Sequence, residues 1–203
     1  MSHSPDDFPP DGMAWGEIPL DARRSVPARQ LADPGPDAAV LLRLLRSAVR
    51  VPDHGRRVPF RFIRVAGPSR AALGELLARR ALERDPAASD AVVEKARGSF
   101  SRAPVVVVVV AVTGPDEKIP ASERFASACC TCFALLQAAQ AFGFGAQWQT
   151  GWAAYDPAVL RALGLGEHEQ VAGFVHIGTP VQAAPERERP DPAALLSDWS
   201  PPA

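Results

Sequence analysis

The sequence predicts a single α+β domain in which helices cover both faces of one sheet. Its most informative stretch is Val105 to Val110, six consecutive valines. Because β-branched residues on both faces of one strand need cover on both sides, this run indicates a central, buried strand. Helical and strand patterns are intermixed around it without an internal repeat, which is typical of helices packed on one sheet. A chain of 203 residues suits one such domain better than two.

Four elements are expected before the valine run. A stripe of apolar residues between Asp37 and Val51 predicts a helix, and Pro52 ends it. Alternation of apolar residues with arginine predicts a strand, and Ser69 and Ser89 are suitable N-caps for two more helices. The expected helices span 37–51, 69–84 and 89–97, and the expected strand spans 60–66.

A long helix of small and apolar residues is expected after the valine run, from Ser122 to Phe142. It carries little charge after Arg124, and a helix that is apolar all round is buried all round, so we expect it to pack on a partner subunit. Asp156 is a suitable N-cap for one more helix, with Pro157 in its first turn. The remaining elements are expected at 146–150 (strand), 157–163 (helix) and 171–178 (last strand).

Composition and charge indicate a soluble globular protein. The formal net charge of −1 provides no basic field that would attract nucleic acid or an anionic membrane. The segment from Met1 to Gly12 is acidic and proline-rich, unlike a secretory signal, and the longest apolar stretch, Ala103 to Val112, has about half the length of a membrane-spanning helix. We expect a cytoplasmic protein with a flexible N-terminal arm (1–20), one domain (21–182) and a C-terminal arm (183–203).

The three cysteines, Cys129, Cys130 and Cys132, lie within one helical stretch. An odd and tightly clustered set does not suit a disulfide framework, and the spacing does not suit a metal site. We therefore expect small, buried core residues and no metal ligands.

Three polar clusters differ from their surroundings. Arg23, Arg24 and Ser25 could clamp an anion, because guanidinium groups bind phosphate oxygens in pairs and serine adds a neutral donor; a solvated basic turn is the alternative. Arg50, Asp53 and His54 could form a polar wall, or simply place favourable cations at a helix C-terminus. The segment 147–151 alternates an indole, an amide and a hydroxyl before a glycine, which suits a flat ligand as well as a plain edge strand.

Taken in order, these clusters resemble those of the nitroreductase family, most closely its short bacterial branch. The resemblance runs from about Asp21 to Pro192. It includes Arg23 to Ser25, Arg50 to His54 and the Gly-Phe-Gly-x-x-Trp-x-Thr-Gly pattern of residues 143–151. Shorter matches lie at 59–62, 102–104 and 178–180.

The resemblance implies a homodimer with a nitroreductase-like central mixed sheet and an FMN site at each side of the subunit interface. By position, Arg23, Arg24 and Ser25 would hold the FMN phosphate and ribityl chain. Arg50 and His54 would reach the same flavin from the other subunit. The residues expected along the flavin ring are Trp148, Gln149 and Thr150, and those associated with NAD(P)H are Ala138, Ala139, Gln140, Ala141, Phe142 and Gly143.

The activity that this resemblance implies is the transfer of hydride from NADH or NADPH, through FMN, to a nitroaromatic, quinone or similar small acceptor in a ping-pong cycle. No residue is expected to act as a catalytic proton donor. Two alternatives stay open: a flavin-binding module without turnover, and another flavin reaction on the same fold, such as dehydrogenation or dehalogenation.

The chain also departs from the family pattern. Pro19 leaves little room for a helix before Arg23. Pro27 and Gln149 stand where relatives often have a basic residue, so we expect a lower flavin reduction potential or weaker flavin binding.

Overall fold

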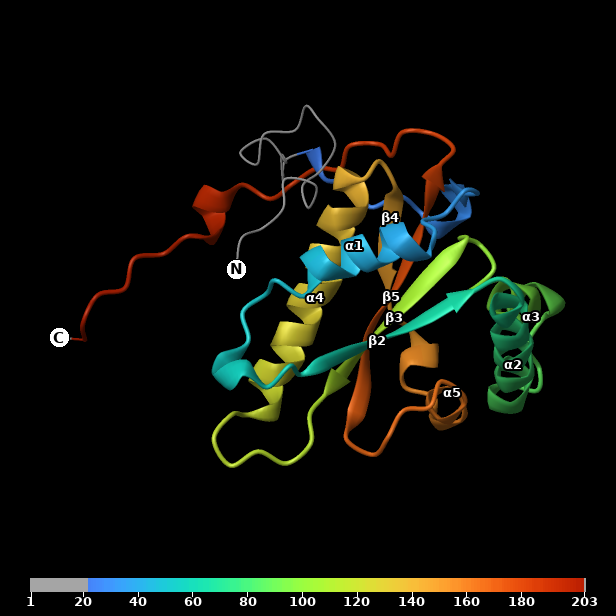
Figure 1. Ribbon diagram of the computed structural model, residues 1–203, viewed down its shortest axis with the longest axis horizontal. Coiled ribbons are helices and arrows are strands. Elements are labelled where there is room, and N and C mark those ends of the chain that lie inside the picture. Colours follow the sequence, from blue (N-terminus) through green and yellow to red (C-terminus); the bar gives the residue numbers. More distant parts are fainter. Residues whose placement is uncertain (1–21, 203) are drawn as a thin grey trace.

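A computed structural model of the protein describes residues 22–202. The expected N-terminal arm, with Pro19, lies outside the described residues. Five strands form one sheet, with helices on both of its faces (Figure 1). The strands are β1 (Leu31–Ala32), β2 (Phe60–Ala66), β3 (Val105–Val112), β4 (Gly145–Gln149) and β5 (Glu169–Pro180). The helices are α1 (Ala38–Ala48), α2 (Pro68–Arg84), α3 (Asp90–Arg97), α4 (Ala121–Ala141) and α5 (Pro157–Ala162).

The sheet has the strand order β1-β5-β3-β2, and β4 pairs with β5. Every strand pairing among the described residues is antiparallel, whereas the expected sheet was mixed. The register shows why: Ala66 at the end of β2 pairs with Val105 at the start of β3, so α2 and α3 return the chain to the end at which β2 finished. The expected α+β class is confirmed, and its sheet is antiparallel.

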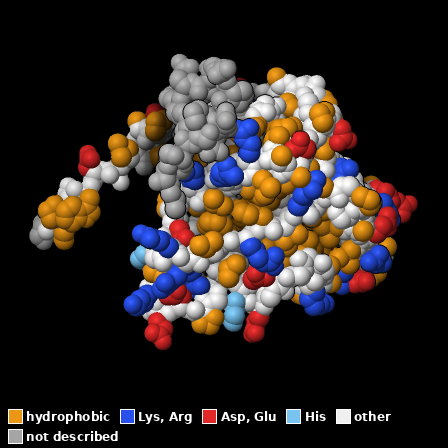
Figure 2. All heavy atoms as spheres, viewed as in Figure 1, with side chains coloured by type: hydrophobic (Ala, Val, Ile, Leu, Met, Phe, Trp, Pro, Cys, Tyr) orange, Lys and Arg blue, Asp and Glu red, His pale blue; other side chains and the backbone are white. Residues whose placement is uncertain are grey.

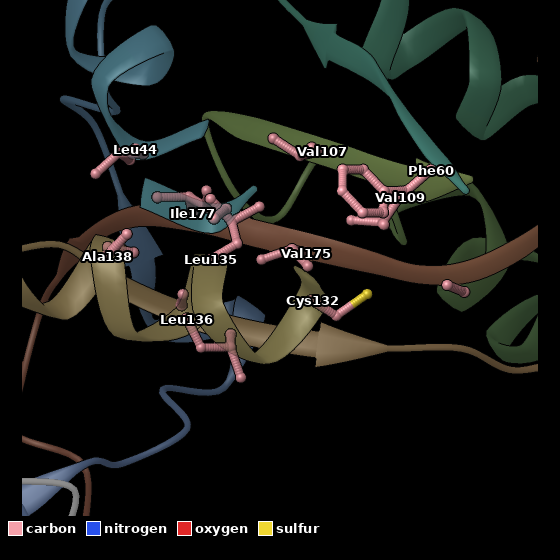
Figure 3. Close-up of a cluster of buried hydrophobic side chains, with 14 of the residues drawn as sticks. Leu44, Phe60, Val107, Val109, Cys132, Leu135, Leu136, Ala138, Val175 and Ile177 are labelled. Atoms are coloured by element: carbon pink, nitrogen blue, oxygen red, sulfur yellow. The ribbon is translucent and has the colours of Figure 1, made fainter. Parts of the chain in front are cut away.

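The valine run is the centre of the molecule, as expected. Val105, Val107 and Val109 pack in a core with α1 and α4, and Figure 3 shows this cluster with Leu44, Leu135 and Val175. The alternate valines of β3 face a second core, built with residues of α2, α3 and α5. Since successive side chains of a strand point to opposite faces, one run of valines contributes to both cores.

The helix starts lie within one residue of expectation, and the largest change in capping is at α2. α2 begins at Pro68, one residue before the expected cap, and its N-cap is Gly67. The hydroxyl of Ser69 instead donates to the carbonyl oxygen of Ala66, 2.7 Å away, within the turn. Asp156 caps α5 as expected, since its carboxylate accepts from the backbone N–H groups of Ala158 and Val159.

α4 is buried on one side only. Cys132 and Leu135 are buried in the core, while Cys130 and Phe133 are exposed on the outer side. The expectation of buried cysteines is therefore wrong for Cys130, because each residue turns the helix by about 100° and neighbouring cysteines face different ways. Burial raises the pKa of the Cys132 thiol well above its ordinary value, so this sulfur behaves as an apolar core group.

The C-terminal segment leaves the body of the molecule. It contains a short 3-10 helix at Pro192–Leu195 and runs away from the sheet and helices (Figure 1). Its large apolar side chains are largely exposed, with Leu195 at 73%, Leu196 at 78% and Trp199 at 82%. Within residues 22–202, none of the helices combines the length and the apolar character needed to cross a membrane.

Candidate functional site

The Arg23–Ser25 segment leads directly onto the outer edge of β4. The backbone N–H of Val26 donates to the carbonyl oxygen of Ala146 at 3.0 Å, and that of Ala28 donates to the side-chain oxygen of Gln147 at 2.7 Å. Gly145 permits this approach, because a β-carbon there would lie 2.9 Å from a methyl carbon of Val26. The fold therefore brings the first and third polar clusters of the sequence together.

A small hollow, which we call the basic hollow, lies beside Arg23, Arg24 and Ser25. Arg187 and Arg189 of the C-terminal segment also line it, and its volume is about 30 Å³. Arg23 Nη1 donates to Ser25 Oγ at 3.2 Å. This volume is about the share of one water molecule in the liquid, so it admits an anion's oxygen rather than a whole phosphate. Guanidinium groups and a hydroxyl are suitable donors for such an oxygen.

Sequence reasoning missed Arg187 and Arg189. Both belong to a segment rich in proline and charge, which is typical of a solvated arm. The alternation Glu-Arg-Glu-Arg at 186–189 is the only local signal. In the structure Glu186 pairs with Arg24 and lies 3.6 Å from Arg189, so the segment supplies both charges to the hollow.

The β4 side chains divide between the two faces of the sheet. The Trp148 indole packs on the α4 side, where its Nε1 donates to the carbonyl oxygen of Ala172 at 3.1 Å. Gln149 points to the opposite face and donates to Gln147 Oε1 at 2.6 Å. Because Ala146 O faces the outer edge of β4, the backbone N–H and C=O of Trp148 face that edge too. At this edge Trp148 therefore offers its backbone, and Thr150 follows the strand as an exposed residue.

Arg50 and His54 both lie along α4, and His54 lies at the end of the helix away from the basic hollow. His54 Nδ1 lies 2.7 Å from Glu123 Oε2 in the first turn of α4, and Ser127 Oγ donates to Pro52 O at 2.7 Å. The 21 residues of α4 span about 30 Å. Since the far end of α4 lies beside Arg24, one chain does not bring His54 to the first and third clusters.

Arg50 lines a larger hollow, which we call the apolar hollow. It lies between α4 and the end of α1, has a volume of about 400 Å³ and includes Phe133 and Gln137. Both terminal atoms of the Gln137 amide are buried and have no hydrogen-bond partner within residues 22–202. Figure 2 shows hydrophobic side chains gathered over the part of this face where α1 crosses α4.

The segment 138–143 does not form one surface. Gln140 and Gly143 line a hollow of about 230 Å³ together with Arg24. The apolar hollow receives Ala138, Ala141 and Phe142. Ala139 is fully buried in the core. Gln140 and Gly143 are therefore the members nearest to the basic hollow.

Comparison with known proteins identifies the family of the chain. The model of the nitroreductase family matches residues 20–179. YdjA of Escherichia coli K12, provisionally named an NAD(P)H nitroreductase, is 34% identical over 176 residues, which cover 86% of this chain and 94% of YdjA. Among solved structures, a nitroreductase-like family protein from Bacillus cereus superposes with a TM-score of 0.78 at 23% identity, covering 93% of this chain and 97% of that one. A nitroreductase with bound FMN from Bacteroides fragilis has a TM-score of 0.67 at 22% identity and covers 91% and 99%. The family match and the identity to YdjA show that the chain belongs to the nitroreductase family.

Proposed function

We propose that this protein is an FMN-dependent oxidoreductase that passes hydride from NADH or NADPH to a nitroaromatic, quinone or similar small acceptor. Family membership supports the proposal, as do the name of YdjA and the FMN in the Bacteroides fragilis structure. The observation that carries it is the placement of Arg23, Arg24 and Ser25 beside β4. Such an enzyme would work in the cytoplasm, where both nicotinamides are available.

The residues present fit FMN chemically. Arg23, Arg24 and Ser25, joined by Arg187 and Arg189, offer charged and neutral donors to a phosphate. Along the edge of β4, the backbone of Trp148 and the side chains of Gln149 and Thr150 can bind the polar rim of a flat ring. When bound, FMN would accept hydride from a nicotinamide and pass the electrons on to the acceptor.

This chain's residues would contribute position and charge. The arginines would hold the phosphate end and so fix where the ring lies along β4. Gln140 and Gly143 line the hollow that contains Arg24, and we place the nicotinamide contact there.

A second copy would complete the site. The outer side of α4 has no charged residue between Ala126 and Ala141, yet Phe133 there is 43% exposed. Packing of a second copy on this face would fill the apolar hollow and could give the Gln137 amide its missing partners. In such a homodimer Arg50 and His54 would reach the flavin of the other subunit. His54 could not reach the flavin of its own subunit, because it lies at the end of α4 away from Arg24.

An absorbance spectrum of the purified protein tests the proposal. We expect flavin bands that bleach when NADH or NADPH is added without oxygen, and that return with a quinone. A colourless protein that does not take up FMN would contradict the proposal. A yellow protein that neither nicotinamide bleaches would favour the flavin-binding module without turnover. The presence of Gln149 and Pro27 in place of basic residues supports that alternative.

Replacing Arg23 with glutamine tests the phosphate contact. Hydrogen bonds to charged groups contribute roughly 1.5–3 kcal/mol, so Arg23→Gln should weaken FMN binding by about 10- to 100-fold, measured by fluorescence titration. Arg79→Gln, at an exposed position of α2, is the matched control and should leave the affinity unchanged. Equal affinities for both variants would show that Arg23 does not hold the phosphate.

A further inference from the structure

His176 is a buried polar residue that the proposed function does not use. It lies on β5 and is only 2% exposed. Its Nδ1 is buried and has no hydrogen-bond partner in the part of the chain that the structure describes. Since buried polar groups in folded proteins are as a rule hydrogen-bonded, this atom needs a partner that residues 22–202 do not supply.

A hollow of about 90 Å³ lies against the His176 ring, and we call it the His176 hollow. Its walls include Phe174 of β5, Phe100 after α3 and the segment 149–151 at the end of β4. The Phe100 ring lies 6.0 Å from the His176 ring and packs edge-on against Phe174 at 5.0 Å. These aromatic contacts hold the imidazole in place beside the hollow.

The lining of the His176 hollow is polar in places but uncharged. Ser99, Gln149 and Thr150 line it, and within residues 22–202 no carboxylate, lysine or arginine does. Burial lowers the pKa of His176 to about 4, with a smaller contribution from the charge of Arg102. At neutral pH the imidazole therefore presents one N–H donor and one bare nitrogen. An ion would lose its hydration here without a charged partner, so the hollow favours neutral ligands.

The size of the hollow limits what can enter. A cavity of roughly 150 Å³ holds benzene, so about 90 Å³ suits a group of a few heavy atoms. A carboxamide meets these conditions, because it is small and uncharged and carries both a donor and an acceptor. It can therefore bond to the imidazole whichever ring nitrogen carries the proton.

We propose that the His176 hollow is a binding subsite for a small uncharged group of the carboxamide type, with the imidazole of His176 as its hydrogen-bond partner. Gln149 and Thr150 contribute both to this subsite and to the candidate flavin edge. The subsite therefore shares two residues with the proposed flavin site, and His176 is the residue that it adds.

Titration with acetamide tests this directly, and acetate is the matched control because it has almost the same shape but carries a charge. The protein has four histidines, so their ring nitrogens can be followed individually by NMR after labelling with ¹⁵N-histidine. We expect acetamide to shift the His176 nitrogens saturably, with a dissociation constant of roughly millimolar order. Acetate should not shift them, and the exposed His54 and His168 should respond to neither.

A second readout uses the backbone amides of Thr150 and Gly151. Acetamide should shift them in the wild type and in His168→Phe, but not in His176→Phe, which keeps an aromatic ring and loses Nδ1. No saturable response of His176 to acetamide, or equal responses to acetamide and acetate, would overturn the proposal. The wild-type titration decides the matter even if His176→Phe does not fold. Neither readout requires FMN. The subsite proposal can therefore fail while the proposed function holds, and the proposed function can fail while the subsite proposal holds.

Nicotinamide, part of the electron donor, carries a carboxamide, and this step rests on the proposed function. The same titration with nicotinamide shows whether the donor reaches the subsite. A saturable shift of the His176 nitrogens assigns the subsite to the donor in place of the hollow at Gln140 and Gly143, and no shift keeps the nicotinamide contact at Gln140 and Gly143.

Discussion

Val58 is a β-branched residue in a left-handed backbone conformation, with φ at 48°. It belongs to the turn after His54, where Arg56 has φ at 52° as well. The carboxylate of Asp53 holds this turn, since it accepts from the backbone N–H groups of Arg57 at 2.9 Å and Val58 at 2.8 Å. The turn thus keeps an unfavourable conformation beside a residue that we assign to the partner's flavin.

Asparagine tolerates the left-handed region better than valine. Val58→Asn should therefore raise the free energy of unfolding by about 1 kcal/mol, because Val58 is 62% exposed and loses little packing. Urea denaturation measures the change. The control, Val92→Asn, concerns a similarly exposed valine within α3, and it should give no gain. Equal effects of both substitutions would show that the conformation of Val58 costs nothing.

His176 should make the stability depend on pH. Its pKa is about 4 in the folded protein against an ordinary value of 6.5. Between these values the unfolded chain binds the proton and the folded protein does not, so the free energy of unfolding falls as the pH falls from 6.5 to 4. The loss should reach roughly 3 kcal/mol at pH 4.

Urea denaturation at pH 7 and pH 4.5 measures this loss. His176→Phe should lose less stability between the two values than the wild type does. His168→Gln, at an exposed position, should behave as the wild type. If His176→Phe loses as much free energy of unfolding as the wild type, another titrating group causes the pH dependence.

Sequence reasoning proposed candidate site residues where the side-chain chemistry was unusual for its surroundings. Arg23 to Ser25 and 147–150 stood out in this way, and the structure brings these two segments together. It could not find Arg187 and Arg189, because their position depends on how an irregular segment returns to the body. Nor could it see that Ala139 is fully buried, because small residues look alike on either side of a helix.

At the scale of the elements, two aspartates cap helices, and they differ in burial and in the number of other contacts they make. Asp37 caps α1 by accepting from the backbone N–H of Val40. Asp156 caps α5, is only 1% exposed and also binds the guanidinium of Arg80 through two nitrogens. The Arg80 guanidinium holds the pKa of Asp156 below its ordinary value. Asp156 therefore joins α2 to α5 as well as starting a helix.

Alanine substitutions separate these two roles. Asp37→Ala should lower the free energy of unfolding by about 1 kcal/mol, the usual cost of a lost cap. Asp156→Ala should cost about 3 kcal/mol or more, because it also leaves Arg80 without its buried partner. Thermal or urea denaturation compares the two. Similar losses would mean that the contact with Arg80 adds no stability.

The elements were predictable where one face is fixed by burial. The bounds of β2 were predicted to the residue, because apolar and charged residues alternate there. The start of α2 was not, because Ser69 bonds to Ala66 and leaves the cap to Gly67. The two-residue β1 was missed, since so short a strand has no periodicity to detect.

At the scale of the molecule, the outer face of α4 should be the subunit interface. Phe133→Asp places a charge in the apolar hollow and should convert a dimer into a monomer, as measured by light scattering after gel filtration. Because Phe133 is 43% exposed in the single chain, the fold and the circular dichroism should be preserved. Leu82→Asp on α2, where leucine is also 43% exposed, should leave the dimer intact. A Phe133→Asp protein that stays dimeric would place the interface elsewhere.

The ion pair between Glu186 and Arg24 has one more consequence. Any phosphate that arrives at Arg24 competes with a carboxylate that is already there, so uptake of the cofactor and release of Glu186 from Arg24 form one equilibrium. Linkage makes such an effect reciprocal: whatever binds the Glu186 carboxylate elsewhere, such as a basic residue of a neighbouring protomer, tightens the hold on the phosphate by the same factor.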